Sequence, residues 1–346
     1  LVIDHSKHLR QILHLDVEQR TVTVEPGMVL DHLNAALKPH GLWYPVDVST
    51  SGQATLGGMA GNNSCGSRSI AYGNMVHNVL GAKAWLSDGD LLDWGPMADS
   101  HGRAERIGHF VRDLAQQLRP EIDAHWPRVL RRVAGYNLDV FHPVSERPYT
   151  QDGSVNLAHL LVGSEGTLAL THSLTLRLSP LPRAKVLGVV NFPTFVQAMN
   201  AAQHIVKLGA AGALSAVELV DRTMIDLAMQ NPAFAPTMRS ALIGEPEAIL
   251  LVEFHGEDKS SLLPFMQDLN DCMSGLGLAD SVVPLVEEAA QKNLWEVRKA
   301  GLNIMMSLKG DGKPVSFIED CAVPLEHLAE YTTALTEVFH QHGTRG

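Results

Sequence analysis

Apolar and polar residues alternate over short runs in the first half of the chain. Two such runs, Ile12–Asp16 and Thr21–Glu25, are joined by a charged turn and predict a β-hairpin. A second pair, Val79–Leu86 and Leu91–Trp94, flanks a short turn rich in Asp and Gly. A longer alternating run, Leu168–Leu178, predicts a further strand. Antiparallel pairs of this kind favour an α+β fold over a doubly wound parallel sheet.

Helical periodicity follows the second hairpin. Ile107–Leu118 has the apolar spacing of an amphipathic helix. We expect Pro120–Val133 to be helical as well, with a break or kink near Pro127. The mostly apolar run Leu157–Val162 predicts another strand, placed directly before a second glycine-bearing loop.

The pattern changes after the sequence Pro180-Leu-Pro182, which we take as a domain boundary. Strand and helix units follow one another from there, which is typical of a ferredoxin-like α+β sheet with helices on one face. We therefore expect domains at residues 1–180 and 181–346. The predicted strands of the second domain are Val186–Phe192, Ala216–Val220, Ala248–Phe254, Ser281–Leu285 and Ser316–Val323.

Composition narrows the function classes. The 346 residues carry a formal net charge of -11, which argues against non-specific nucleic-acid binding. No apolar run reaches the roughly 18–20 residues of a membrane span. The three cysteines are widely spaced, which fits neither a disulfide framework nor a metal knuckle and suits a reducing compartment. We expect a cytoplasmic protein, with peripheral attachment to an inner membrane left open.

The two ends resemble interior segments of a protein. The chain starts without Met in the apolar run Leu1–Asp4 and stops at Gly346, just after a helix-like segment. We expect an internal piece of a longer protein.

One stretch, Asp47–Gly73, is unusually rich in glycine and small polar residues and poor in apolar ones. Its glycines are Gly52, Gly57, Gly58, Gly61, Gly66 and Gly73. Glycine permits positive φ and lets main-chain N–H groups approach a ligand closely, and successive N–H groups form anion-binding concavities. The stretch therefore favours a loop around a phosphate-bearing cofactor; the competing interpretation is a solvated surface loop.

Three further features bear on chemistry. Glu165 lies in the tight loop Gly163–Thr167, either as a turn residue or as a carboxylate that binds a ligand or orients the loop. A basic run could be a solvated helix end or could face a carboxylate substrate; it comprises Arg128, Arg131 and Arg132. Cys65 is interpreted as a small residue in a tight turn, with flavin attachment as the alternative.

Common cofactor and hydrolase motifs are absent. The sequence has no G-x-x-x-x-G-K-[ST] and no G-x-G-x-x-G after a strand, which argues against a P-loop and a Rossmann site. It also has no G-x-S-x-G and no H-E-x-x-H. A phosphate-bearing cofactor would have to bind in another way.

The glycine stretch resembles a known flavoprotein domain. The pattern of Pro45, Ala54–Gly58, Asn62–Gly66, Tyr72-Gly73 and Asp88-Gly89 is similar to the second half of the FAD-binding domain of the vanillyl-alcohol-oxidase/PCMH superfamily. Leu161–Leu168 resembles the second signature of that domain, and residues 181–346 resemble the C-terminal domain of FAD-linked oxidases. Within the superfamily, the closest likeness is to the group formed by glycolate oxidase, D-lactate dehydrogenase and D-2-hydroxyglutarate dehydrogenase.

The resemblance implies an α+β protein made of a PCMH-type FAD-binding domain, truncated at its N-terminus, and a ferredoxin-like cap domain, truncated at its C-terminus. It also implies non-covalent FAD. The residues that the resemblance assigns to FAD are Pro45, Thr55, Leu56, Gly57, Gly58, Gly61, Asn62, Ser64, Gly66, Tyr72, Gly73, Gly163, Glu165, Gly166 and Thr167.

A substrate site is implied in the second domain. In the family an arginine on a cap-domain helix pairs with the carboxylate of a 2-hydroxy acid, and Arg298 matches that position; an ordinary surface arginine is the alternative. Lys313 is the nearest candidate for a further lysine. Where the family has a threonine four residues after the arginine, this chain has Leu302.

The implied activity is oxidation of a small D-2-hydroxy acid, such as D-lactate, glycolate or D-2-hydroxyglutarate, by hydride transfer to flavin N5 and then to a separate electron acceptor. Another substrate class on the same fold, or a non-catalytic flavin-binding module, is the alternative, and a homodimer is left open. The family's first phosphate loop would precede Leu1, and its metal-binding histidine motif would follow Gly346. We expect this piece alone to bind FAD weakly and to be inactive, with any divalent metal or iron–sulfur cluster held elsewhere in the longer protein.

Overall fold

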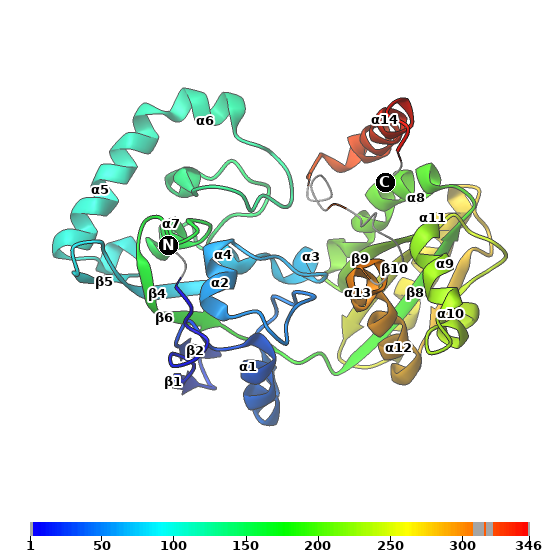
Figure 1. Ribbon diagram of the computed structural model, residues 1–346, viewed down its shortest axis with the longest axis horizontal. Helices are drawn as coiled ribbons and strands as arrows, with labels where there is room; N and C mark the ends of the chain where they lie inside the picture. The colour runs from blue at the N-terminus through cyan, green and yellow to red at the C-terminus, as the bar shows by residue number, and fades with distance from the viewer. Residues whose placement is uncertain (1–2, 307–314, 316–320, 345–346) are drawn as a thin grey trace. The chain divides into compact units, whose positions relative to one another are not determined.

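The computed structural model describes residues 3–306, 315 and 321–344. The chain forms two compact units, Leu1–Leu181 and Pro182–Gly346, here called the N-terminal and C-terminal units (Figure 1). Each has a sheet of its own with helices packed against it.

The main sheet of the N-terminal unit has five strands in the order β1-β2-β6-β4-β5, and all neighbours are antiparallel. Both predicted hairpins are confirmed, because β1 pairs with β2 and β4 with β5. The bounds are β1 Ile12–Asp16, β2 Thr21–Val24, β4 Val79–Trp85, β5 Leu91–Trp94 and β6 Leu170–Arg177. A small sheet joins β3 (Leu42–Trp43) to β7 (Ser179–Pro180).

The hydrophobic core of this unit lies between the main sheet and short helices. Helix α1 (Leu30–Leu37) buries Leu30, Leu33 and Leu37, the helical repeat expected of a face turned to the core. The glycine stretch is more ordered than a loop, since it contains α2 (Leu56–Gly61) and α3 (Ser69–Tyr72) and leads directly into α4 (Met75–Asn78). The remaining helices are α5 (Gly102–Gln117), α6 (Arg119–His125), α7 (Ala158–Leu161) and the 3-10 turns η1 (Lys38–His40), η2 (Met97–Asp99) and η3 (Leu138–Phe141).

One sequence prediction in this unit is wrong and another holds only in part. Leu157–Val162 is not a strand but contains α7, whose four residues are all buried; a fully apolar run does not distinguish a buried strand from a buried helical turn. The predicted helix Pro120–Val133 forms only as far as His125. The break predicted near Pro127 is confirmed, because Trp126 precedes that proline and adopts extended backbone, but no helix follows it up to Val133.

The C-terminal unit contains a four-stranded antiparallel sheet in the order β11-β8-β10-β9. Strand β10 is apolar at nearly every position, as expected of a strand buried on both faces. On one face Phe254 stacks on Phe265 of α11, and on the other Leu251 shares a core with Leu294 of α12. Helices therefore cover both faces, and the expectation of helices on one face is wrong.

The strands of this unit are β8 Ala184–Phe192, β9 Leu214–Asp221, β10 Ala248–Gly256 and β11 Val282–Leu285. Its α-helices are α8 Phe195–Ile205, α9 Arg222–Gln230, α10 Ala235–Ala241, α11 Leu263–Gly275, α12 Glu288–Lys299, α13 Gly301–Met306 and α14 Leu328–Gln341, with 3-10 turns η4 Val206–Ala211, η5 Ser260–Leu262 and η6 Leu325–His327. The strand predicted at Ser316–Val323 lies mostly outside the described residues. Within the described part of the chain, no helix is both long and apolar enough to cross a membrane.

Candidate functional site

An ion pair between Asp47 and Arg68 joins the beginning of the glycine stretch to a point near its end. The Arg68 guanidinium donates to Asp47 across 2.6 Å, and the Arg68 main-chain N–H donates to the same carboxylate at 3.0 Å. Burial raises the pKa of Asp47, and the charge of Arg68 acts in the opposite direction. Between them, Gly66 packs so closely on Asp47 that a Cβ there would overlap its carboxylate and main-chain nitrogen. The stretch therefore has a defined shape.

The first main-chain N–H groups of helix α2 form hydrogen bonds with an earlier segment of the chain. The N–H groups of Leu56 and Gly57 donate to the Met28 and Pro26 carbonyls at 2.9 and 2.7 Å. Leu56 is fully buried in the core, and a Cβ on Gly57 would overlap Pro26. The N–H groups of Leu56 and Gly57 are therefore engaged within the chain, and the two residues pack α2 against the preceding segment; their contact with a cofactor stays a prediction.

The second glycine-bearing loop lies directly on the first. The Gly163 N–H donates to the Ala60 carbonyl and the Glu165 N–H to the Gly61 carbonyl, both at 2.9 Å. Gly163, Glu165 and Gly166 all have positive φ, between 52° and 85°. Such backbone is unfavourable for a glutamate, so the loop holds Glu165 in a conformation that non-glycine residues seldom adopt. Two loops far apart in sequence thus form one continuous surface.

The other predicted cofactor residues differ in exposure. Pro45, Leu56, Gly66, Gly73 and Gly163 are buried; Thr55, Gly57, Gly61, Ser64 and Tyr72 are half-buried; and Gly58, Asn62, Glu165, Gly166 and Thr167 are exposed. The exposed members come from both loops, so the surface available to a ligand is made jointly by α2 and the second loop.

Asn63 lies beneath this surface and was not predicted. It is 1% exposed, has a φ of 51°, and its side-chain oxygen accepts from the Val76 N–H at 2.9 Å. Its side-chain Nδ2 is buried and has no acceptor among the described residues. A buried donor without an acceptor is rare in proteins, and binding sites are one place where it occurs.

Helix α3 is held at its carbonyl end by a distant arginine. Arg147 donates to the Ser69 and Ile70 carbonyls at 2.9 and 2.7 Å, and Arg131 donates to the Ser69 hydroxyl at 2.7 Å. Tyr72, which ends α3, packs edge-on against Trp43. Arg131, which belongs to the predicted basic run, therefore binds a side chain of the glycine stretch.

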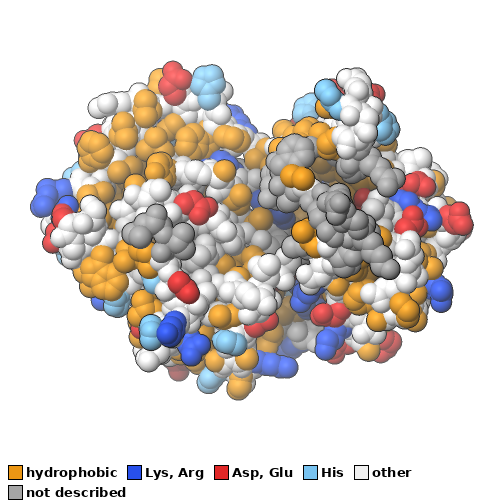
Figure 2. All heavy atoms as spheres, in the orientation of Figure 1, with side chains coloured by type: hydrophobic (Ala, Val, Ile, Leu, Met, Phe, Trp, Pro, Cys, Tyr) orange, Lys and Arg blue, Asp and Glu red, His pale blue; other side chains and the backbone are white. Residues whose placement is uncertain are grey.

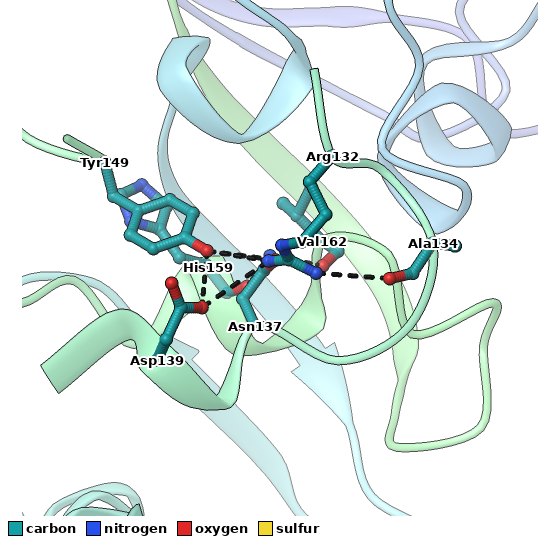
Figure 3. Close-up of polar contacts among 7 residues, drawn as sticks. All are labelled: Arg132, Ala134, Asn137, Asp139, Tyr149, His159 and Val162. Carbon is teal, nitrogen blue, oxygen red and sulfur yellow. Dashed lines mark hydrogen bonds and ion pairs between the residues drawn. The ribbon is translucent and has the colours of Figure 1, made fainter. Parts of the chain in front are cut away.

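Arg132 belongs to a buried polar network that sequence reasoning missed (Figure 3). It donates to the Tyr149 hydroxyl at 2.7 Å, and that hydroxyl donates to Asp139 at 2.6 Å. Asn137, also bonded to Arg132, donates to the His159 and Val162 carbonyls at 2.8 and 2.9 Å. Arg132 is thus neither a solvated helix end nor exposed to a substrate. The only sequence signal is Gly135–Leu138, which by itself indicates no more than the end of a helix.

Two histidines beside this network are neutral at pH 7. Burial lowers the pKa of His77 and of His159 to about 4, and the Arg147 charge adds to the effect at His77. His159 donates its Nε2–H to the Val79 carbonyl at 3.0 Å. Among the described residues, no group of three or more His, Cys, Asp or Glu could hold a metal ion.

In the C-terminal unit, Arg298 is tied to one carboxylate. Its Nε and Nη2 atoms both donate to Glu218 Oε2, at 3.1 and 2.8 Å, from α12 to β9. The Arg298 side chain is 40% exposed and that of Glu218 is 14% exposed. The Nε edge of the guanidinium is thus occupied while the group remains open to solvent. Lys313 lies outside the described residues.

Two family models of known proteins match the two parts of this chain. A family model described as an FAD binding domain matches residues 1–95, and one described as the C-terminal domain of FAD linked oxidases matches residues 181–346. The two units of the chain therefore resemble the two domains of FAD-linked oxidases. The predicted resemblance is thereby confirmed, as is the α+β pairing of these two domains.

Two curated relatives of this chain are named as dehydrogenases of 2-hydroxy acids. The D-2-hydroxyglutarate dehydrogenase of Pantoea ananatis is 32% identical over 99% of this chain and 34% of its own length. The mitochondrial D-lactate dehydrogenase (cytochrome) of Arabidopsis thaliana is 27% identical over 93% of this chain and 45% of its own length. The chain therefore spans about a third to a half of these relatives.

A solved structure of alkyldihydroxyacetonephosphate synthase shares the fold, with a TM-score of 0.57 and 17% identity over 87% of this chain and 45% of its own.

The residues of the N-terminal unit fit FAD. The joined loops carry no lysine or arginine between Thr55 and Gly66, so a pyrophosphate here must be met by main-chain dipoles and small hydroxyls. A side chain at Gly66 would have no room, and one at Gly163 would have little. In the same glycine stretch, the buried side-chain N–H2 group of Asn63 has no acceptor among the described residues. The surface formed by α2 and the loop Gly163–Thr167 therefore has no basic side chain of its own.

Proposed function

We propose that the protein containing this chain oxidises a small D-2-hydroxy acid with FAD as its cofactor and delivers the electrons to a separate acceptor. The observation that carries this proposal is Arg298, a part-exposed guanidinium with one edge engaged, in a domain that matches the C-terminal domain of FAD-linked oxidases. The names of the two curated relatives, both dehydrogenases of 2-hydroxy acids, support the substrate class.

FAD would be held by the surface that α2 and the second loop form together. The proposed contacts come from the exposed and half-buried residues Thr55, Gly58, Gly61, Asn62, Ser64, Tyr72, Glu165, Gly166 and Thr167, with Pro45, Gly66, Gly73 and Gly163 shaping the backbone beneath. Leu56 and Gly57 contribute through packing rather than hydrogen bonds to the cofactor. When bound, FAD supplies a two-electron acceptor for hydride.

Arg298 would bind the substrate carboxylate. A guanidinium donates two parallel hydrogen bonds to a carboxylate, and charge-assisted bonds of this kind are roughly twice as strong as neutral ones. Because Glu218 engages Nε and Nη2 through one oxygen, the guanidinium plane is held in one orientation. A carboxylate would thus meet a donor pair that is already positioned. Lys313 is proposed as a second cation for the same substrate.

The test is turnover of a panel of D- and L-2-hydroxy acids by the full-length protein with an artificial electron-accepting dye. We expect oxidation of D-2-hydroxy acids and at least a roughly tenfold rise in KM for Arg298→Lys, because lysine cannot form the bidentate pair. Lys299→Met is the matched control, since Lys299 is on the same helix in an exposed pair with Glu296. No turnover of any 2-hydroxy acid, or equal KM values in the parent and Arg298→Lys, would contradict the proposal.

A further inference from the structure

Tyr136 stands at the edge of the second loop with its ring in solvent. The residue is 51% exposed, and its hydroxyl lies 2.8 Å from the Thr167 hydroxyl. Thr167 donates its own hydroxyl hydrogen to the Ser164 carbonyl at 2.6 Å. A threonine hydroxyl has one hydrogen, so Tyr136 must be the donor to Thr167. The ring is thereby anchored at its hydroxyl end to the second loop, which would hold FAD.

The backbone on both sides of Tyr136 is also anchored. On one side, Gly135 has a φ of 79°, and its carbonyl lies where a Cβ on Gly163 would come within 2.9 Å. On the other side, Asn137 is fully buried and bonded to the His159 and Val162 carbonyls. Tyr136 therefore has little freedom to move relative to the second loop.

The anchoring comes from the network around Arg132 (Figure 3). Arg132 donates to the Ala134 carbonyl at 3.1 Å and forms an ion pair with the buried Asp139 at 3.5 Å, and the Tyr149 hydroxyl bonds to both residues. Burying an ion pair is at best weakly favourable compared with apolar packing, so such a network needs another reason to exist. Here it fixes the segment of chain that carries an exposed aromatic ring.

An exposed aromatic residue alone means little. Phe110 on α5 is 68% exposed, and Figure 2 shows other hydrophobic side chains gathered over α5 and α6. Phe110 has no polar group with which to fix its ring. Tyr136 differs because its ring is held at both the hydroxyl and the backbone, next to the loop Gly163–Thr167, where FAD is proposed to bind. An aromatic ring that is held in place, exposed to solvent and close to a proposed cofactor site is suited to stacking on a planar base.

We propose that Tyr136 is the surface on which the adenine ring of FAD stacks. The inference rests on the proposed binding of FAD by the two loops. FAD has two planar ring systems, the isoalloxazine and the adenine. The solvent-exposed position of Tyr136 favours the adenine as its stacking partner. The ring that accepts hydride needs surroundings from which water is excluded, whereas the adenine performs no chemistry and tolerates a solvent-exposed edge.

The experiment compares three ligands on the full-length protein depleted of flavin: FAD, ADP and FMN. ADP has the adenine without the isoalloxazine, and FMN the reverse. We expect Tyr136→Ala to weaken FAD and ADP by roughly five- to 150-fold, the usual value of one base stacked on an aromatic side chain, and to leave FMN unchanged. Tyr136→Phe keeps the ring and should stay within about threefold of the parent.

Phe110→Ala is the matched control, because it removes an exposed aromatic ring away from the second loop. Tyr136→Leu gives a second test should the alanine variant fail to fold. Equal weakening of FMN and FAD, or unchanged FAD and ADP affinity in Tyr136→Ala and Tyr136→Leu, overturns the inference while the proposed function stands. A parent protein that binds no flavin at all overturns both.

Discussion

Asp47 and Arg68 form a short, largely buried ion pair that joins the beginning of the glycine-rich stretch to a point near its end. The two charged atoms are 2.6 Å apart, and the Arg68 and Asp47 side chains are 13% and 18% exposed. The same carboxylate also accepts the Arg68 main-chain N–H. One carboxylate therefore fixes both the charge and the backbone of Arg68, and so fixes the path of the segment between them.

Replacing Asp47 should loosen the glycine stretch. Asp47→Asn leaves the Arg68 charge without this carboxylate in a poorly solvated position, and we expect a loss of about 2–4 kcal/mol in the free energy of unfolding of the N-terminal unit. Urea denaturation measures it. The matched control is Asp90→Asn, which removes one partner of the exposed Arg103 and should cost much less stability. Equal losses in the two variants would show that the Asp47 pair is no more than a surface contact.

Gly66 should tolerate no side chain. In Gly66→Ala the new Cβ would overlap Asp47, whose position is already fixed by Arg68, so the backbone itself must shift. We expect destabilisation of about 1–3 kcal/mol, the usual cost of overpacking, together with weaker binding of FAD. Gly95→Ala is the control, because nothing lies within 4 Å of a Cβ there. Thermal unfolding and flavin fluorescence report the two effects, and a Gly66→Ala protein with parental values for both would refute the packing argument.

His159 should make the N-terminal unit sensitive to mild acid. Its pKa is lowered by burial from 6.5 to about 4, so as pH falls below 6.5 the unfolded chain takes up a proton before the folded one does. Stability is therefore complete above pH 6.5 and declines down to pH 4. At pH 5 this histidine should lower the free energy of unfolding by about 2 kcal/mol. His77 acts in the same direction.

Urea denaturation at pH 7 and pH 5 tests this dependence. His159→Gln keeps a donor for the Val79 carbonyl but does not titrate, so it should lose about 2 kcal/mol less than the parent between these pH values. His125→Gln, at a histidine whose side chain is 76% exposed, should behave like the parent. A parental pH dependence in His159→Gln would mean that the pKa of His159 does not change on folding.

Glu218 should act on substrate binding through Arg298. Glu218→Ala frees the guanidinium to rotate, so the donor pair is no longer held for a carboxylate. If Arg298 binds the carboxylate equally in the ground and transition states, KM should rise about three- to tenfold with kcat unchanged. Steady-state kinetics with the preferred 2-hydroxy acid measure both constants. A lower KM in Glu218→Ala would instead show that Glu218 competes with the substrate.

The sequence predicted the strands of the N-terminal sheet well and its helices less well. The hairpins β1–β2 and β4–β5 have local alternation and a short turn, and both signals are independent of the rest of the chain. α7 was missed because its apolar run is buried on every side, so it carries no periodicity. The C-terminal sheet was expected to be covered on one face only, although the continuous apolar run of β10 indicates two covered faces.

For the site, the sequence by itself predicted which loops would hold a cofactor and determined which family the chain resembles, because glycine spacing is a local, chemically specific property. Only the tertiary structure decided how those loops are built. The contacts of Gly163 with Ala60, of Arg132 with Tyr149 and of Arg298 with Glu218 join residues that no local pattern relates. Each depends on which side chains the folded core brings together, and that is a property of the whole chain rather than of any segment.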